Sequence, residues 1–172
     1  SGNASISASD VDGGSSDACG IDSLSVSPNT FTCAGVGGNT VTLTATDNNG
    51  NIDSCTAIVT VVDTVAPIAL CQGLTVHLDA SGNASITAQD IENGSNDACG
   101  IDSLSVTPGT FTCAEVGVNT VTLTATDNNG NTGSCTAFVT VEDTVAPNAV
   151  CQNITVQLNA AGNASIVAGD LD

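Results

Sequence analysis

Thr120–Thr126 reads Thr-Val-Thr-Leu-Thr-Ala-Thr, and the same seven residues stand at 40–46. Alternation of apolar and hydroxyl side chains with a period of two is typical of a β-strand that buries one face. Val121, Leu123 and Ala125 therefore face the core, and the threonines face outward. The turn sequence Asp-Asn-Asn-Gly-Asn follows at 127–131, and a second strand is expected over 134–141.

The residues before this stretch show the same short strand-like pattern. A polar loop, Glu92–Gly100, lies among them, and no segment has helical periodicity. Further strands are predicted over Leu70–Leu78, Ala84–Ile91, Ile101–Val106 and Thr110–Cys113. Six or seven short strands joined by Gly- and Asn-rich turns predict an all-β fold of β-sandwich units.

The chain repeats itself with a period of 80 residues. Between 17–67 and 97–147, 43 of 51 positions are identical, and Ser1–Ile6 returns at 81–86 and, with one change, at 161–166. A fixed period of this size indicates self-contained units in a row rather than one enzyme domain. We therefore expect an extended rod with three segments: 1–63, a β-sandwich repeat without its first strand; 64–143, a complete repeat; and 144–172, the first two strands of a third.

The charge is one-sided. The 172 residues include 18 acidic side chains, no lysine and no arginine, which gives a formal net charge of −18. Such a polyanion is repelled by nucleic acid phosphates and by anionic membrane surfaces, so both classes of partner are excluded. Disorder is excluded too, because 41% of the residues are apolar and alternate in strand-like runs.

Eight cysteines, four in each period, predict disulfide bonds in an oxidising compartment. In a tandem array the first and last strands of a unit start at the same pole, so the strand order favours Cys71–Cys135. Cys19–Cys33 and Cys99–Cys113 would then close local loops, and Cys55 and Cys151 would pair outside this segment. The alternative pairs sequence neighbours, Cys55 with Cys71 and Cys135 with Cys151. A zinc site is disfavoured because the chain has no CxxC pair and only one histidine.

Several phrases resemble the hyalin repeat, an immunoglobulin-like extracellular module. Asp-Thr-Val-Ala-Pro stands at 63–67 and 143–147 with a cysteine four residues later, and Asp97–Gly100, Ala125–Asn131 and Cys135 with the following Thr-Ala-Phe-Val-Thr-Val match as well. The resemblance covers the whole chain and implies tandem modules of secreted or cell-surface proteins that serve adhesion or form a stalk. Cys113 departs from the pattern, since the family often places its extra cysteine earlier.

Acidic and amide side chains recur in the loops that the strand order places at one pole of each unit. Mixed carboxylate and amide oxygens on flexible loops are the ligands that Ca²⁺ prefers, and without a cation the carboxylates would repel one another. Mg²⁺ demands stricter octahedral geometry, and the lack of sulfur and imidazole argues against zinc or copper. The alternative is that these acids only solvate loops. The predicted metal ligands are Asp10, Asp12, Asp17, Asp47, Asn49, Asp63, Asp90, Glu92, Asn96, Asp97, Asp127, Asn129, Asp143, Asp170 and Asp172.

Catalysis has no support in the sequence. His77 is replaced by Gln157 in the next copy, so no histidine-dependent site recurs. Three phenylalanines with no tryptophan or tyrosine are too few aromatics for the usual sugar-binding cleft of a glycosidase. Attached glycan is a further expectation, because Asn-x-Ser/Thr acceptors stand at Asn3, Asn83, Asn93, Asn153 and Asn163.

These patterns together predict an extracellular or cell-surface structural protein: a calcium-bound, disulfide-stapled β-sandwich rod that builds a fibre, stalk or matrix filament. The alternative is a cell-surface adhesin module that binds glycan or protein. The expected partners are copies of the chain itself, with head-to-tail continuation and lateral packing. Continuation would run through one polypeptide or through strand donation, with Cys151 of one chain bridging Cys55 of the next.

Overall fold

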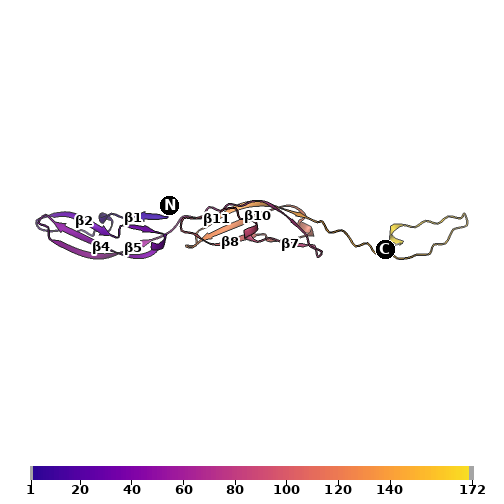
Figure 1. Ribbon diagram of the computed structural model, residues 1–172, viewed down its shortest axis with the longest axis horizontal. Helices are drawn as coiled ribbons and strands as arrows, with labels where there is room; N and C mark the ends of the chain where they lie inside the picture. The colour runs from indigo at the N-terminus through magenta and orange to yellow at the C-terminus, as the bar shows by residue number, and fades with distance from the viewer. Residues whose placement is uncertain (1, 171–172) are drawn as a thin grey trace.

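The structure is a computed structural model, and it describes residues 2–170. Figure 1 shows two groups of strands that follow one another along the longest axis, with the C-terminal residues extending beyond them. The all-β class predicted from the sequence is confirmed, because strands in several sheets dominate and the only α-helix within residues 2–170 has four residues. Among the described residues, no helix has the length and apolar content needed to cross a bilayer.

The second group of strands, called the second region below, runs from β6 to β11. Its main sheet has the order β6-β11-β10-β8, and a two-stranded sheet pairs β7 with β9. β6 runs parallel to β11, whereas β10 is antiparallel to both of its neighbours. The strands are β6 (Leu74–His77), β7 (Asn83–Ser85), β8 (Ile101–Thr107), β9 (Thr110–Thr112), β10 (Gly117–Asp127) and β11 (Thr132–Glu142).

The first region repeats this plan with one strand fewer. Its main sheet has the order β2-β4-β5, and β1 pairs with β3. The strands are β1 (Asn3–Ser5), β2 (Ile21–Ser27), β3 (Thr30–Thr32), β4 (Gly37–Asp47) and β5 (Ile52–Val61). Within residues 2–170, no strand occupies the place beside β5 that β6 takes beside β11.

The buried core follows the alternation that the sequence predicts. In β10, Val121, Leu123 and Ala125 are fully buried, and the threonines between them are half-buried. Phe111 is also fully buried, although it lies on a strand of only three residues. The core cluster of the second region consists of Leu78, Ile86, Ala88, Ile91, Phe111, Val121, Leu123, Ala137, Val139 and Val141.

The predicted strand Ala84–Ile91 is wrong in its second half. The strand ends at Ser85, and the helix α1 (Ala88–Ile91) follows with Thr87 as its N-cap. The Asp90 carboxylate accepts hydrogen bonds from the Thr87 amide (2.7 Å) and hydroxyl (2.8 Å), which closes a capping box. The chain turns inward here because Ala88 and Ile91, three residues apart, both enter the core.

Two disulfides are present among the described residues. Cys71 is bonded to Cys135 with the Cα atoms 6.1 Å apart, the pair that the strand order favours. Cys33 of the first region is bonded to Cys99 of the second, with the Cα atoms 5.1 Å apart. Cys55 and Cys151 are exposed and unbonded. The structure therefore forms neither of the neighbour pairs Cys55–Cys71 and Cys135–Cys151.

The predicted local bonds Cys19–Cys33 and Cys99–Cys113 are also wrong. Cys99 lies just before β8, and Cys113 lies just after β9. The seven extended residues of β8, about 23 Å long, therefore place the two cysteines at opposite ends of the second region. β9 stays at the far pole, where it pairs with β7, and the thiol of Cys113 lies 3.8 Å from the Gly82 carbonyl oxygen. Cys33 has the same place in the first region and therefore faces the next unit instead of its own loop.

Candidate functional site at the junction

The linker between β5 and β6, residues 62–73, lies on the surface of the second region. Ile68 exchanges backbone hydrogen bonds with Asn96 (2.8 and 3.0 Å), and Cys71 forms a bridge with Glu92. The Ser95 hydroxyl bonds both the amide (3.0 Å) and the carbonyl (3.1 Å) of Leu70. The linker is thus held by the loop that follows α1.

The linker also passes close over β11. Gly133 has no side chain, and a β-carbon at that position would overlap the carbonyl oxygen of Pro67. Pro67 is itself buried. Glycine is therefore required at position 133 for its small size, because the linker backbone occupies the space of a side chain.

Two predicted ligands meet at this junction. One oxygen from each of Asp63 and Asp97 and the sulfur of Cys99 lie within 4.8 Å of one another. Within residues 2–170, no other group of three His, Cys, Asp or Glu side chains approaches so closely. The Cys99 sulfur is bonded to Cys33 and is therefore no thiolate ligand, so the site is defined by the two carboxylates.

One oxygen of each carboxylate accepts a hydrogen bond from a backbone amide. Asp63 Oδ1 accepts the amide of Val65 (3.0 Å), and Asp97 Oδ1 accepts the amide of Cys99 (2.7 Å). Asp63 Oδ2 is buried and has no hydrogen-bond partner among the described residues. A buried carboxylate oxygen without a partner is costly, and a cation beside it would remove that cost.

A turn of the second region also reaches the linker. The side-chain amide of Asn131 donates to the Asp63 carbonyl oxygen (3.2 Å) and to Asp127 Oδ2 (2.8 Å). Asp127 is only 2% exposed, and its Oδ1 accepts the amides of Asn129 (2.9 Å) and Asn131 (2.8 Å). Burial raises the pKa of Asp127, but the hydrogen bonds from the Asn131 side chain and the Asn129 and Asn131 amides outweigh it and leave the pKa lowered. This carboxylate therefore orders the turn.

Four predicted ligands are engaged in local capping bonds. Asp10 and Asp90 each accept the backbone amide and hydroxyl of the residue three positions earlier, and these bonds lower both pKa values. Glu92 accepts the Gly94 amide (2.7 Å). Asp12 accepts the hydroxyl and amide of Ser15, which lower its pKa.

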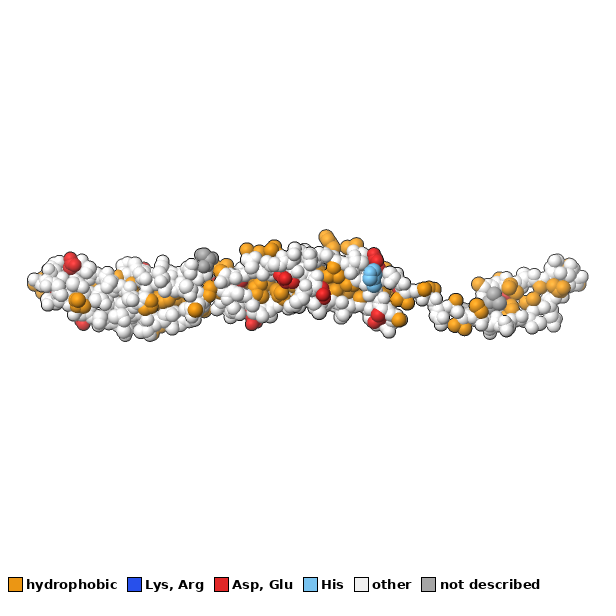
Figure 2. All heavy atoms as spheres, viewed as in Figure 1, with side chains coloured by type: hydrophobic (Ala, Val, Ile, Leu, Met, Phe, Trp, Pro, Cys, Tyr) orange, Lys and Arg blue, Asp and Glu red, His pale blue; other side chains and the backbone are white. Residues whose placement is uncertain are grey.

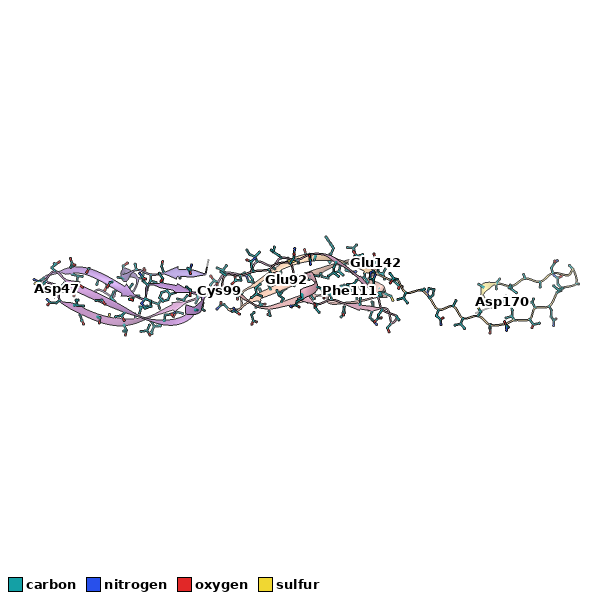
Figure 3. All side chains as sticks on the ribbon, viewed as in Figure 1. Asp47, Glu92, Cys99, Phe111, Glu142 and Asp170 are labelled. Atoms are coloured by element: carbon teal, nitrogen blue, oxygen red, sulfur yellow. A yellow bond between two sulfur atoms is a disulfide. The ribbon has the colours of Figure 1, made fainter. Side chains whose placement is uncertain are left out.

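The remaining predicted ligands lie in turns. Asp17 accepts the Cys19 amide (2.7 Å), and Asp47 accepts the Asn49 amide (2.8 Å), as their counterparts one period later do. Asp143 and Asp170 accept the amides of Val145 (3.0 Å) and Val167 (2.8 Å), and Asp172 lies outside the described residues. Figure 3 shows Asp47 at the outer end of the first region and Asp170 in the C-terminal segment, both far from Cys99 at the junction. Of the predicted ligands, the structure brings Asp63 and Asp97 together, with Asp127 and Asn131 behind them, and Asp17 and Asp47 line one cavity of the first region; the metal itself stays a prediction.

The sequence reading missed the part that Cys33 plays here. It lies beside Asp63 on the wall of a cavity of about 190 Å³ that Val61, Val65 and Cys99 also line. The space-filling view shows apolar and acidic side chains along the molecule, and the sequence has no lysine or arginine. Any cation at the junction would therefore come from solution.

The fold and the site together define an all-β protein with two disulfides, one of which joins successive regions. No protein-family model matches the chain. The chain is 32% identical over 174 residues to a protein of Acholeplasma phage L2 described as an uncharacterized 81.3 kDa protein. The alignment covers 93% of this chain but only 23% of that relative, so the chain spans about a quarter of its length.

Proposed function

We propose that the chain is an extracellular structural protein in which Ca²⁺ and disulfides stiffen a row of immunoglobulin-like units into a rod. The observation that carries this proposal is the buried, unpartnered Oδ2 of Asp63 beside the carboxylate of Asp97. The two aspartates belong to different parts of the chain. Asp63 ends the first region, whereas Asp97 lies in a loop of the second.

The donor set fits a hard cation. Both carboxylates keep one oxygen free of backbone hydrogen bonds, and the side-chain NH₂ of Asn131 donates to the Asp63 carbonyl and holds the linker beside them. Ca²⁺ takes six to eight oxygens and accepts irregular geometry, so water would complete a shell that begins with two carboxylates. Affinities of about 0.1–1 mM are usual for extracellular calcium modules. A rod that works at extracellular calcium concentrations needs no tighter site.

The mechanical consequence follows from where the aspartates lie. With Ca²⁺ between Asp63 and Asp97, the linker and the loop are tied together and the repulsion between the two carboxylates is removed. Cys33–Cys99 already restrains the same junction covalently. Together the two restraints convert a hinge into a stiff connection.

The proposal extends to the class and location of the protein. The tandem units, the hyalin-like phrases and the four-strand sheet with a parallel edge strand support an immunoglobulin-like array. Disulfides are typical of secreted and cell-surface proteins. In this setting the array forms a stalk, fibre or matrix filament.

Calcium binding to the purified chain tests the proposal. Isothermal titration with Ca²⁺, followed by thermal unfolding in Ca²⁺ and in EDTA, is expected to show millimolar binding and a higher melting temperature with the ion. Asp63→Asn and Asp97→Asn should each weaken binding at least tenfold. Mg²⁺ should bind more weakly, because it demands near-ideal octahedral geometry.

Asp143→Asn is the matched control. Asp143 repeats Asp63 and makes the same bond to the amide two residues later, but it is exposed. Its substitution should leave calcium binding at the junction unchanged. Equal losses for Asp63→Asn and Asp143→Asn, or no binding at millimolar Ca²⁺, would overturn the calcium-stiffened rod.

A further inference from the structure

The disulfide at the junction joins two cysteines that lie far apart in the sequence. Cys33 and Cys99 are separated by 66 residues and belong to different regions, and their Cα atoms are 5.1 Å apart. Figure 3 shows Cys99 between the two groups of strands. Before the bond forms, these residues carry two thiols at the place where Asp63 and Asp97 present their carboxylates. No CxxC motif indicates such a set, because the fold and not the spacing brings the two cysteines together.

The first region holds two members of this set without help from the disulfide. Gly37 at the start of β4 pairs with Val61 at the end of β5. Cys33 precedes β4 and Asp63 follows β5, so both lie at the same end of this hairpin. Both also line the cavity of about 190 Å³ at the junction. The hairpin therefore keeps the two side chains together in the reduced chain.

The second region holds the other two members. Asp97 Oδ1 accepts the Cys99 amide (2.7 Å), and the Cys99 carbonyl oxygen accepts the side-chain amide of Asn128 (2.7 Å). The linker is bonded to the same region, since the Asp63 carbonyl accepts the Asn131 side chain (3.2 Å). None of these hydrogen bonds involves a sulfur atom. The reduced junction therefore retains the contacts that place Asp63 beside Asp97.

Two thiolates and two carboxylates are the ligands of a zinc site. Zn²⁺ binds cysteine sulfur at about 2.3 Å and carboxylate oxygen at about 2.0–2.2 Å, almost always with four ligands in a tetrahedron. Neighbouring ligand atoms on such an ion are about 3–4 Å apart. One ligand atom from each of Asp63, Asp97 and Cys99 already lies within 4.8 Å of the others. Small side-chain rotations, with Cys33 as the fourth ligand, complete the shell. Soft thiolates favour zinc over Ca²⁺, which takes oxygen ligands.

We propose that the junction binds one Zn²⁺ before its disulfide forms, through the thiolates of Cys33 and Cys99 and one oxygen each of Asp63 and Asp97. The ion also compensates the buried Oδ2 of Asp63, which has no hydrogen-bond partner among the described residues. The site belongs to the dithiol chain. It goes beyond the calcium-stiffened rod and does not depend on it, although the two ions would share both aspartates.

Zinc at this place limits the formation of wrong disulfides. The chain has eight cysteines, and holding two of them on the ion reduces the number of ways in which the cysteines can pair roughly sevenfold. The ion also keeps Cys33 and Cys99 side by side, as their later bond requires. Zinc binding therefore favours the bond that joins the two regions.

Formation of the disulfide releases the ion. The two zinc-bound thiolates give two electrons to a small disulfide such as glutathione disulfide, which takes up two protons and becomes two thiols. One sulfur–sulfur bond forms, two zinc–sulfur bonds break, and Zn²⁺ leaves with its charge unchanged. The two carboxylates remain. Oxidation thus changes the junction from a site for a sulfur-binding metal to a site with oxygen ligands alone.

Alkylation of the reduced chain tests the proposal one cysteine at a time. A phosphine reduces the disulfides without adding a thiol, and iodoacetamide is then applied with and without one equivalent of Zn²⁺. Proteases that cut at Asp and Glu release the peptides for mass spectrometry, since the chain has no Lys or Arg for trypsin. Residues 18–22 and 98–102 would give identical peptides, so the chain carries Cys19→Ser.

Zinc should slow the alkylation of Cys33 and Cys99 at least tenfold. Cys71 and Cys135 are the internal control, because they form the other disulfide but belong to no such group of metal ligands in the described part of the chain. Their alkylation should change less than twofold. Equal rates with and without zinc at Cys33 and Cys99 would overturn the proposal, whether the reduced junction is folded or not.

Two matched substitutions show which side chains hold the ion. Cys33→Ser should remove the protection of Cys99, whereas Cys71→Ser should leave it unchanged. Neither substitution removes a bond from the reduced chain, so the two are comparable in stability. Asp63→Asn should weaken the protection at least tenfold, and Asp143→Asn, at the exposed counterpart, should not. Protection of Cys99 that survives Cys33→Ser would contradict the proposed ligand set.

Release of the metal completes the test and separates it from the calcium site. Glutathione disulfide added to the zinc-loaded chain should release one ion for each Cys33–Cys99 bond formed, measured with a zinc indicator dye. Calcium binding is measured on the oxidised chain. Zinc protection without calcium binding would leave this inference and remove the calcium-stiffened rod. Calcium binding without zinc protection would do the reverse.

Discussion

Residues 3–61 and 83–141 have nearly the same sequence, yet they do not bury the same atoms. Val139, Val141 and Ala137 are 0%, 1% and 6% exposed, whereas Val59, Val61 and Ala57 are half-buried. Both regions form the same hairpin, with the same ten residue pairs between its two long strands. The difference is that the linker and β6 cover the second region. A hairpin with the right alternation therefore forms a sheet, but an added segment completes its core.

The largest expected difference between the regions concerns the disulfide Cys71–Cys135. The double substitution Cys71→Ser with Cys135→Ser should destabilise the second region by about 4 kcal/mol, because a closed loop of 64 residues is released in the unfolded chain. Hydrogen exchange of β10 and β11 amides in increasing urea measures the loss. Cys55→Ser is the control and should change the stability of the first region by less than about 0.5 kcal/mol. Equal losses in both regions would contradict the comparison.

The next prediction exchanges the residues at two equivalent positions, Asp53 in the first region and Gly133 in the second. Gly133→Asp should displace Pro67 and destabilise the second region by about 3 kcal/mol, since the new side chain competes with a buried backbone. The reverse change, Asp53→Gly, should cost less than about 1 kcal/mol in the monomer, the usual effect of glycine in a strand. Chemical-denaturant unfolding of both variants decides this. A neutral Gly133→Asp would show that the linker does not require the close approach.

A smaller effect is expected from a matched pair in the core. Val139→Ala removes two methyl groups from a fully buried position and should cost about 2 kcal/mol. Val59→Ala makes the same change at a half-buried position and should cost less than about 1 kcal/mol. Region-specific hydrogen exchange again gives both values.

The smallest expected effect is on the pH dependence of the free energy of unfolding. The pKa of Asp127 is lowered in the folded chain, so its contribution to stability is complete above its unfolded pKa and is lost as the pH falls through the folded value. Asp127→Asn should therefore flatten the fall in stability between about pH 5 and pH 2. Asp47→Asn should flatten it less, because Asp47 is only half-buried. Unfolding free energies measured across this range test both. A steeper fall in Asp127→Asn would reverse the sign of this argument.

Most of the fold is predictable from local patterns. The strands β8, β9, β10 and β11 lie within a few residues of the predicted ranges, because a period of two and Gly- or Asn-rich turns are local signals. The helix α1 was missed, although Thr87 and Asp90 stand at the spacing of a capping box. A single helical turn has too few residues to show periodicity.

The contacts between units were predictable only in part. Asp63 and Asp97 were both expected at one pole, but Asp90 and Glu92 are engaged by local hydrogen bonds that the pole argument ignores. Cys33–Cys99 was missed because spacing along the chain says nothing about which cysteine of one unit faces the next. The required glycine at position 133 was equally hidden, since only the path of the linker gives it a reason.

The disulfide between Cys33 and Cys99 also affects how the molecule responds to a pulling force. A pull along the chain can pass from Cys33 through the two sulfur atoms to Cys99, which bypasses the residues between them. Cys71–Cys135 begins before that loop closes, so the two loops overlap and the chain between the two disulfides carries the force from one to the other. Roughly 220 Å of extended length stays locked within the first loop alone. Reduction of the two disulfides should therefore release length that the breaking of hydrogen bonds alone does not.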